Sequence, residues 1–253
     1  MHAGMVVSIV SHGHGALVQR LLHQLAGASA ASITRVVVTH NVPEPELQVP
    51  AGGWPFALEI VCNAAPRGFG ANHNHALRGA VEPFVCVLNP DVELLAAQEP
   101  FAALVRTASE PGVGCAYPLQ LDAVGRVQDC ERETPSPLAL WRRRVLRRHE
   151  REVDWVNAAC LVLPLPAWQA VRGFDESYFM YCEDVDLCLR LRLGGLRLQR
   201  APARVVHAGQ RASGRHWRHL IWHVRSLLRL WCSDVYRRAR RLPAAPRGGG
   251  RLD

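Results

Sequence analysis

Short apolar runs alternate with segments of helical spacing over the first hundred residues. Four apolar runs predict β-strands at residues 6–10, 33–39, 58–62 and 84–88. Between the first two, apolar side chains recur at Leu17, Leu21, Leu22 and Leu25, the spacing of an amphipathic helix. A second helix is expected with the glycine-rich turn within residues 67–80. Because strands separated by helices pair in parallel, this half predicts a doubly wound α/β sheet that binds ligands at the carboxyl ends of its strands.

Glycine and proline punctuate the next part of the chain. Residues 113–127 have the sequence pattern of strands and turns, and residues 155–163 form another apolar, strand-like run. Residues 132–152 between them are polar and rich in Arg, and we expect a mobile connection there. Residues 181–193 mix apolar positions with charge and precede Gly194-Gly195, which is a helix-stop signal.

The last part of the chain has its own pattern. From His216 to Arg241, apolar residues recur near helical spacing with Trp and Arg around them. Two interpretations stay open: an interfacial helix on anionic lipid, or a helix that packs on a protein surface with a solvated Arg face. We expect a main domain over residues 1–215, with halves at about 1–110 and 111–215. A basic helical segment at 216–241 and a disordered tail at 242–253 would follow.

Composition is that of an ordinary globular protein. The 253 residues are 49% hydrophobic and 21% charged, enough for one large α/β domain or two small ones. The formal net charge is +8, and all thirty basic residues are Arg. Such a charge suits nucleotide phosphates or anionic lipid. A nucleic-acid partner is not expected, because a recognition helix or an aromatic-studded basic sheet is not evident.

Cysteine spacing predicts a reducing compartment, and hydropathy predicts a chain that does not cross a membrane. The eight Cys residues form no C-x-x-C pair, and several lie inside apolar, strand-like runs (Cys62, Cys86 and Cys160), so buried free thiols are expected. The N-terminus lacks the pattern of a signal peptide, and no apolar run approaches the roughly 18 residues that cross a bilayer. We therefore expect a cytoplasmic protein, either soluble or peripheral on the inner face of the cell membrane.

Two groups of carboxylates are candidates for chemistry. Asn89-Pro90-Asp91 directly follows an apolar strand, where its oxygens can hold a hard divalent cation or can simply form a turn or helix cap. Glu183, Asp184 and Asp186 lie within four residues of one another. One of them, near apolar residues, can have a raised pKa and act as a general base. The alternative is a solvated acidic helix start that the helix dipole stabilises.

A histidine and a glycine-rich turn add further candidates. His207 ends an apolar strand, where a ligand would lie, although a lone His is more often structural. Residues 66–74 place Arg67 and Gly68-Phe69-Gly70 before a helical segment. Such a turn offers backbone N–H groups and positive charge to phosphates, but glycine-rich turns are also common in proteins without this role.

Together and in this order, these motifs resemble glycosyltransferase family 2, in particular rhamnosyltransferase-like enzymes of bacterial polysaccharide assembly. The resemblance runs from Val6 to about Gly214. It rests on Val7 to Ser11, Gly68 to Gly70 with Asn74, Leu88 to Asp91, Gly173 to Glu176, Glu183 to Cys188, and His207. It implies the GT-A fold, a Rossmann-like, mostly parallel sheet with helices on both faces, in which the second half binds the acceptor.

The resemblance also implies roles for individual residues. Asp91 would be a ligand of a divalent cation, Mg²⁺ or Mn²⁺, bound to the donor diphosphate, and His207 a further ligand. Asp184 resembles the catalytic base, and Glu183 its neighbour in the acceptor site. The donor-binding group would be Ser11, Asn41, Arg67, Gly68, Asn74 and Asn89.

The activity implied is an inverting transfer of a hexose or deoxyhexose. The donor would be deoxythymidine-diphosphate rhamnose or a uridine-diphosphate sugar, and the acceptor a cell-surface glycan or a lipid-linked molecule. Family members commonly carry Asp after the second strand, near the nucleotide base, whereas this chain has His40-Asn41. The competing hypothesis is a catalytically inactive protein of the same fold that binds a nucleotide or a glycan.

Overall fold

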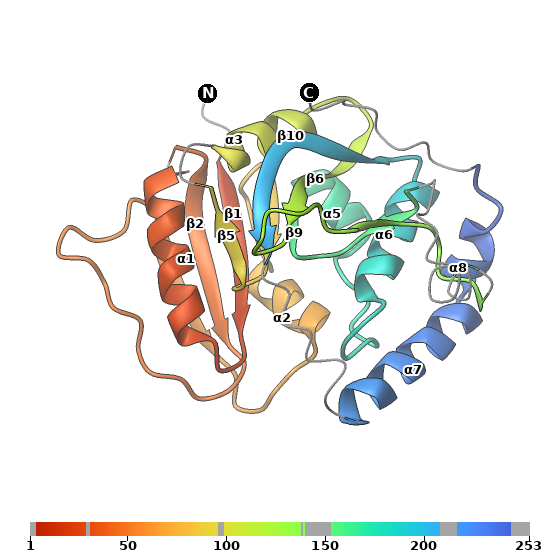
Figure 1. Ribbon diagram of the computed structural model, residues 1–253, viewed down its shortest axis with the longest axis horizontal. Coiled ribbons are helices and arrows are strands. Elements are labelled where there is room, and N and C mark those ends of the chain that lie inside the picture. Colours follow the sequence, from red (N-terminus) through yellow and green to blue (C-terminus); the bar gives the residue numbers. More distant parts are fainter. Residues whose placement is uncertain are drawn as a thin grey trace.

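An eight-stranded sheet runs through both halves of the chain in the order β3-β2-β1-β4-β9-β6-β10-β5 (Figure 1). The computed structural model describes residues 4–28, 31–95, 99–137, 139, 153–207 and 217–243. The strands are β1 (Met5–Ser11), β2 (Ile33–His40), β3 (Ala57–Cys62), β4 (Phe84–Leu88), β5 (Val92–Leu94), β6 (Val113–Leu121), β7 (Glu131–Arg132), β8 (Trp155–Val156), β9 (Cys160–Pro164) and β10 (Arg197–His207). The helices are α1 (Gly15–Ala28), α2 (Phe69–Ala76), α3 (Pro100–Ala108), α5 (Leu165–Ala170), α6 (Glu183–Leu193), α7 (Trp217–Cys232) and α8 (Asp234–Ala239).

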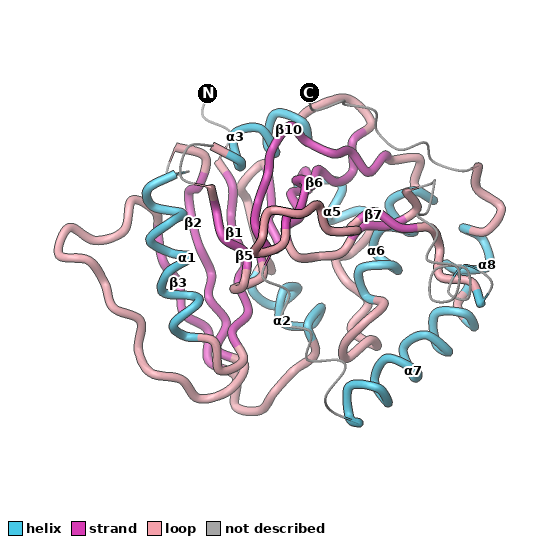
Figure 2. The backbone as a smooth tube through the Cα atoms, viewed as in Figure 1, coloured by secondary structure: helices cyan, strands magenta, loops and turns pink. Residues whose placement is uncertain are grey.

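The first four strands of the sheet are parallel. β1 pairs with β2 on one side and β4 on the other, so that Val7 lies opposite both Val36 and Cys86. β1 and β4 are nearly continuous, buried apolar runs, as expected where helices cover both faces of a parallel sheet, whereas the edge strand β3 is mostly exposed. The four predicted strands and the leucine-rich helix α1 are therefore confirmed. Figure 2 shows the connection between β2 and β3 as a long loop at the side of the molecule.

The second half adds strands in both directions. β9 lies antiparallel between β4 and β6, and β10 runs parallel to β6 along the far side of the sheet. The short β5 pairs antiparallel with the end of β10. The predicted run at 155–163 is divided, since β8 leaves the main sheet and pairs with β7. The insertion of β9 places the second half beside the carboxyl end of β4.

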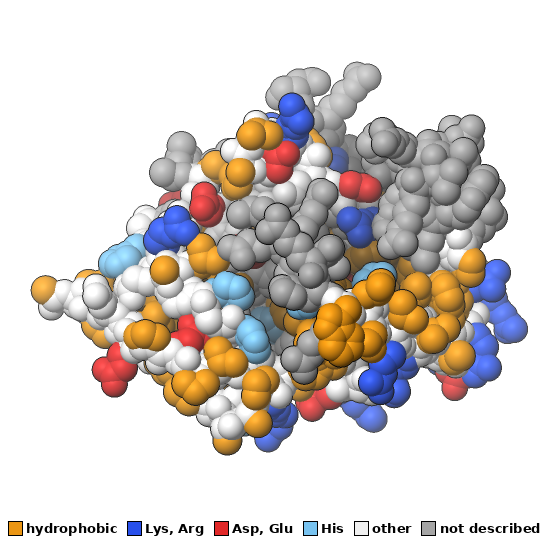
Figure 3. Space-filling view, turned by 60° about the horizontal axis from the view of Figure 1, so that its bottom comes forward, with side chains coloured by type: hydrophobic (Ala, Val, Ile, Leu, Met, Phe, Trp, Pro, Cys, Tyr) orange, Lys and Arg blue, Asp and Glu red, His pale blue; other side chains and the backbone are white. Residues whose placement is uncertain are grey.

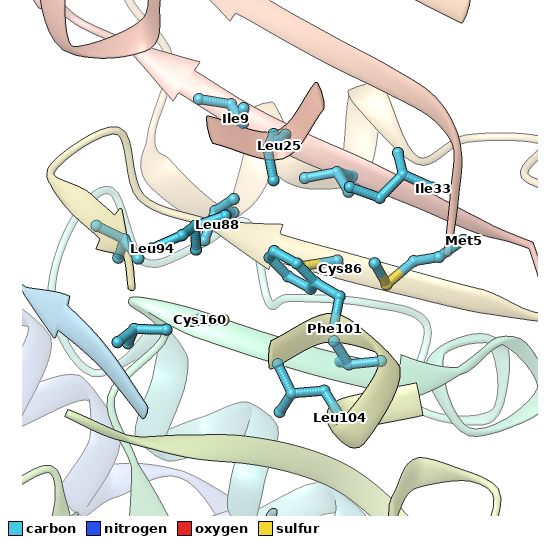
Figure 4. Packing of buried hydrophobic residues seen from close by; sticks show 14 of the residues in the cluster. Met5, Ile9, Leu25, Ile33, Cys86, Leu88, Leu94, Phe101, Leu104 and Cys160 are labelled. Atoms are coloured by element: carbon cyan, nitrogen blue, oxygen red, sulfur yellow. The ribbon is translucent and has the colours of Figure 1, made fainter. Parts of the chain in front are cut away.

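Two apolar layers enclose the sheet. On one face, Leu25 of α1 and Phe101 and Leu104 of α3 pack over strand residues such as Cys86 (Figure 4). The other face packs against α2, α5, α6 and α8. Neighbouring residues such as Val6 and Val7 belong to opposite layers, as the two-residue period of a strand requires. The prediction of a mostly parallel α/β sheet with helices on both faces is confirmed.

The C-terminal segment forms two helices. α7 ends at Cys232, and α8 begins after Ser233, whose Oγ accepts a hydrogen bond from Tyr236 N–H at 3.1 Å. Among the described residues, no helix is long and apolar enough to span a bilayer. Most of the expected tail, residues 244–253, lies outside the described residues.

Two expectations need correction. All eight Cys are free, and six are buried, but Cys62 is exposed because β3 is the edge strand of the sheet, and Cys232 is exposed on α7. The expected mobile connection is wrong at its start, where Arg132 belongs to β7 and pairs with Trp155. Residues 138 and 140–152 of that connection lie outside the described residues.

Candidate active site

Asp91 and His207 meet at the carboxyl ends of their strands. After β4 the chain turns tightly, since Val92 N–H donates to the Asn89 carbonyl at 3.2 Å, and it then enters β5. Because β5 pairs with β10 and Val92 lies opposite His207, Asp91 is brought beside the last residue of β10. Asp91 Oδ1 lies 3.4 Å from His207 Nε2, and the two side chains are 16% and 15% exposed. The two predicted metal ligands are therefore neighbours at an accessible edge.

This pair fits a divalent cation that also binds a substrate. Two ligands of one octahedral cation with bonds of about 2.1 Å lie about 3 Å apart, close to the observed separation. The described residues contain no group of three or more His, Cys, Asp and Glu side chains placed to hold a metal. For a cation held by a few protein side chains, substrate oxygens and water are the usual further ligands. Within the described part of the chain His207 Nδ1 is buried and has no hydrogen-bond partner, while the His207 carbonyl accepts a hydrogen bond from Gln128 Nε2 at 2.6 Å.

A strained turn precedes the acidic start of α6. Tyr181 and Cys182 have φ angles of 71° and 65°, which are rare for residues with side chains. Each such residue costs about 1–3 kcal/mol and persists only where surrounding contacts hold it. The contacts here include Phe69 N–H to the Phe179 carbonyl at 2.9 Å and Ser226 Oγ to the Met180 carbonyl at 2.8 Å. The turn places Glu183 and Asp184 in the first turn of α6.

The three carboxylates of this helix start have different environments. Asp186 bonds to Arg190 at 2.7 Å, and Arg190 in turn donates to the Gly173 carbonyl at 2.7 Å. Asp186 therefore fastens α6 to the turn after α5. Burial raises the pKa of Glu183 well above its usual range, and repulsion from Asp184 raises it further. Oε2 of Glu183 is buried and has no hydrogen-bond partner among the residues that the structure describes.

Asp184 has the pKa expected of a general base. Burial raises its pKa to about 6, although Val185 N–H and the positive charge of Arg132 act in the opposite direction. Val185 N–H lies 2.8 Å from Asp184 Oδ1. A carboxylate with this pKa is mostly ionised at neutral pH, yet it is more basic than an exposed Asp.

The turn between β8 and β9 connects the two carboxylate groups. The Ala158 backbone N–H stabilises the Asp184 carboxylate, and the next residue, Ala159, accepts a hydrogen bond from Asn89 N–H at 2.8 Å. Asp184 and the Asn89-Pro90-Asp91 turn therefore contact adjacent residues of one short segment. This relationship brings the predicted base to the strand end that carries Asp91.

Close packing explains the two glycines of the turn before α2. A Cβ on Gly68 would lie 2.7 Å from the Phe179 carbonyl oxygen, and one on Gly70 would lie 2.6 Å from Phe174 Cβ. Because Phe69 N–H already bonds to Phe179, this N–H is not available to a phosphate. The turn therefore packs against the loop before α6. The sequence pattern did not indicate this contact. Arg67 remains half-exposed, with its guanidinium 3.7 Å from Glu176.

Amide side chains hold the predicted donor-binding turn in place. Asn41 Oδ1 accepts from Arg67 N–H at 2.8 Å, and Asn41 Nδ2 donates to the Arg67 carbonyl at 3.0 Å. Asn74 makes the same kind of paired contact: its Nδ2 donates to the Phe174 carbonyl at 2.9 Å, and its Oδ1 accepts from Phe174 N–H at 2.8 Å. Ser11 is buried at the end of β1 and donates to Glu44 at 2.8 Å. These three residues thus stabilise the walls of the site, and their contact with a donor stays a prediction.

Three further residues of the site were not predicted. Glu44 accepts hydrogen bonds from Ser11 Oγ and from Gly13 N–H and so holds the loop after β1. Arg132 stacks over the Trp155 ring, 5.3 Å from its centroid, and lowers the pKa of Asp184. His73 lies within α2, with its Nδ1 2.8 Å from Ser8 Oγ on β1, and burial lowers its pKa to about 3. No sequence pattern indicates these roles, because each depends on contacts between distant segments.

A cavity of 310 Å³ lies beside this site, between the end of α2 and α5. Its lining includes Asn74, Arg78, Trp168, Arg172 and Glu176. It includes neither the predicted metal ligands nor the acidic start of α6. The strand ends, rather than this cavity, therefore carry the groups suited to catalysis.

Comparison with known proteins supports a transferase. No protein-family model matches the chain. The chain is similar to N-acetylglucosaminyl-diphospho-decaprenol L-rhamnosyltransferase of Mycobacterium tuberculosis, with 29% identity over 87% of this chain and 81% of the relative. It is also similar to Rhamnosyltransferase WbbL of Escherichia coli strain K12, with 39% identity over 30% of each chain.

Solved structures show the same fold. The mannosyltransferase PcManGT from Pyrobaculum calidifontis, in complex with GDP-Man and Mn²⁺, matches 89% of this chain with a TM-score of 0.60 and 17% identity. The match spans 64% of that chain, so this chain covers less than two thirds of the mannosyltransferase's length. TarS 1–349 of S. aureus in complex with UDP matches 93% of this chain and 68% of its own, with a TM-score of 0.52 and 14% identity. At such identities, the likeness concerns the fold.

Proposed function

We propose that this chain is a glycosyltransferase of the GT-A fold related to the bacterial rhamnosyltransferases of family 2, and that it performs an inverting, metal-assisted sugar transfer. The donor would be a nucleoside-diphosphate sugar and the acceptor a hydroxyl group of a glycan or a lipid-linked molecule. One observation carries the proposal. The segment at Ala158 and Ala159 connects Asp184, a carboxylate with a raised pKa, to the turn that carries Asp91 beside His207.

The donor diphosphate would lie at the strand ends. Asp91 and His207 would hold the divalent cation together with diphosphate oxygens. Such a cation neutralises the negative charge that develops on the leaving nucleoside diphosphate. The complex of PcManGT with GDP-Man and Mn²⁺ supports this assignment by analogy of fold. Arg67, half-exposed at the rim, would add a positive charge toward the donor.

Asp184 would accept the proton of the acceptor. The acceptor oxygen forms a bond to the anomeric carbon from the face opposite the leaving group, while the bond to the diphosphate oxygen breaks. The proton passes to Asp184, and the diphosphate leaves with the bonding electron pair, so the anomeric configuration is inverted. Glu183 is less suited to this step, because its strongly raised pKa favours the protonated form.

The relatives suggest the substrates. Two of them carry the name rhamnosyltransferase, which supports an activated rhamnose such as deoxythymidine-diphosphate rhamnose over a uridine-diphosphate sugar. The name of the mycobacterial relative includes N-acetylglucosaminyl-diphospho-decaprenol, a lipid-linked sugar. A lipid-linked acceptor at the cytoplasmic face of a membrane therefore suits this chain.

The proposal can be tested with purified protein. A panel of nucleotide sugars is first screened by thermal shift with Mn²⁺, and the stabilising donor is then supplied with a polyprenyl-diphosphate-linked sugar. We expect a new glycosidic bond whose anomeric configuration, determined by NMR, is opposite to that of the donor. Retention of configuration would refute the inverting mechanism. Donor binding without hydrolysis or transfer would instead identify an inactive binding protein.

A further inference from the structure

One face of α7 is fixed to the domain by specific contacts. Leu230 is fully buried, and Ser226 Oγ donates to the Met180 carbonyl. Trp231 Nε1 donates to the Pro135 carbonyl at 2.6 Å, and Tyr181 Oη lies 2.9 Å from His219 Nδ1. The packing interpretation of this helix is therefore correct for its inner face. The same contacts fix which face of α7 points away from the domain.

The outer face of α7 is an exposed apolar stripe. Its members follow helical spacing and are exposed by 73% (Trp217), 62% (Leu220), 43% (Ile221), 47% (Val224) and 53% (Leu228). Eleven large apolar side chains are exposed among the described residues, and these five lie on one helix. Figure 3 shows hydrophobic side chains gathered toward the right of the view, with Arg side chains at the edge of the patch. An apolar surface of this kind indicates a binding face.

Phe179 extends the stripe toward the active site. Its side chain is 39% exposed, and its ring lies 5.0 Å from the ring of Trp222 on α7. Phe179 belongs to the loop that contacts Gly68 and leads into the acidic start of α6. The apolar surface is thus continuous with the loop that positions Glu183 and Asp184.

Positive charge borders the stripe. From Trp217 to Ser233 the chain contains no Asp or Glu. Arg225 and Arg229 are exposed and lie one turn apart on the flank of the helix. Exposed arginines continue through α8 and beyond it, at Arg237, Arg238, Arg240 and Arg241. Apolar side chains with arginines along one edge fit the boundary between acyl chains and anionic headgroups.

We propose that α7 and Phe179 form a docking surface for an anionic lipid bilayer. The helix, about 24 Å long, would lie in the plane of the membrane with its apolar stripe inserted and its arginines at the headgroups. This placement brings the loop before α6 to the membrane surface. The inference deepens the proposed function, and in that respect rests on it, because it names the surface where a lipid-linked acceptor would be met.

The test is binding of the full chain to vesicles. Wild type and the double variant Leu220→Gln, Val224→Gln are floated with vesicles of phosphatidylglycerol and phosphatidylcholine. Gln keeps the helix propensity and the charge but removes apolar contact. We expect wild type to bind the anionic vesicles, with binding that weakens as salt rises. The double variant should partition about tenfold or more weakly.

A matched control separates the stripe from general surface hydrophobicity. The double variant Val81→Gln, Val124→Gln removes two valines that are even more exposed but lie outside α7, and it should bind like wild type. Unchanged binding of the α7 variant, or no binding of wild type at low salt, would refute the proposal. A wild-type dimer that dissociates on the α7 substitutions would also refute it, by identifying a self-association face. The assay uses neither donor nor acceptor, so its failure is distinct from failure of the proposed transfer.

Discussion

His207 Nε2 lies 3.4 Å from Asp91 Oδ1, although the two residues belong to different halves of the chain. The antiparallel pairing of β5 with the end of β10 creates this contact. It gives the strand ends a pair of side chains whose separation suits two ligands of one cation.

Asp91→Ala should abolish transfer and weaken metal-dependent donor binding by at least about a hundredfold, because a direct ligand contributes more than the supporting residues around a metal. Calorimetry with a nucleoside diphosphate, with and without Mn²⁺, measures the effect. Glu110→Ala, which removes an exposed carboxylate after α3, serves as the control and should bind normally. Full activity of wild type in EDTA would contradict the metal assignment.

Arg67→Ala should raise the donor dissociation constant about tenfold or more, the effect of losing a charged hydrogen bond. Thermal stability should change little, because its ion pair with Glu176 is long and partly exposed. Calorimetry of donor binding is the measurement, and Arg106→Ala on α3 is the matched exposed arginine. Equal affinity of folded Arg67→Ala and wild type would remove Arg67 from the donor site.

Asp184→Asn should reduce kcat by about a hundred- to ten-thousandfold, because the amide cannot accept the acceptor proton. Donor affinity should stay the same, since the diphosphate would lie at the Asp91 end of the site. Steady-state kinetics and calorimetry on the same preparation separate the two effects. Normal turnover would exclude Asp184 as the base, and loss of donor binding would place the acidic helix start in the metal site.

The raised pKa of Asp184 also predicts pH dependence. Its pKa of about 6 in the folded protein exceeds its usual value of 3.8, so kcat/KM should fall as pH drops through about 6. Between pH 4 and 6 the folded state holds this proton more tightly than the unfolded state, so ionisation of Asp184 lowers stability as pH rises. Asp184→Asn should therefore melt at a higher temperature than wild type at pH 7.5, with the difference shrinking toward pH 4. An equal or lower Tm at pH 7.5 would contradict the raised pKa.

Gly70→Ala should destabilise the protein by about 1–3 kcal/mol, because its Cβ would lie 2.6 Å from Phe174 Cβ. Urea unfolding measures the change in the free energy of unfolding. Gly27→Ala in α1 is the matched control and should be neutral or stabilising, since its Cβ would meet no atom of the described residues within 4 Å. Similar unfolding midpoints for the two variants would argue against the close approach.

The local pattern of the sequence predicted β1 to β4, α1 and α2, and it identified the candidate site residues, but it predicted neither β5 nor α3. Apolar runs such as that of β4 and the leucines of α1 report side-chain periodicity, which depends only on neighbouring residues. Parallel strands place their carboxyl ends at one edge, so the residues after β4 and at the end of β10 were recognisable as candidates. The same pattern left α7 open between membrane and protein packing.

Tertiary structure decided the relationships between distant segments. The insertion of β9 beside β4, the division of the 155–163 run and the pairing of β5 with β10 depend on which surfaces pack together. Packing also gives the two aspartates different environments: Asp186 forms an ion pair with Arg190, whereas the carboxyl group of Asp184 is desolvated. Gly68 and Gly70 resemble a phosphate-binding turn in sequence, but in the fold Phe179 and Phe174 pack directly against these two glycines. Such effects arise from contacts that local periodicity does not encode, because desolvation and close approach depend on residues brought together only by folding.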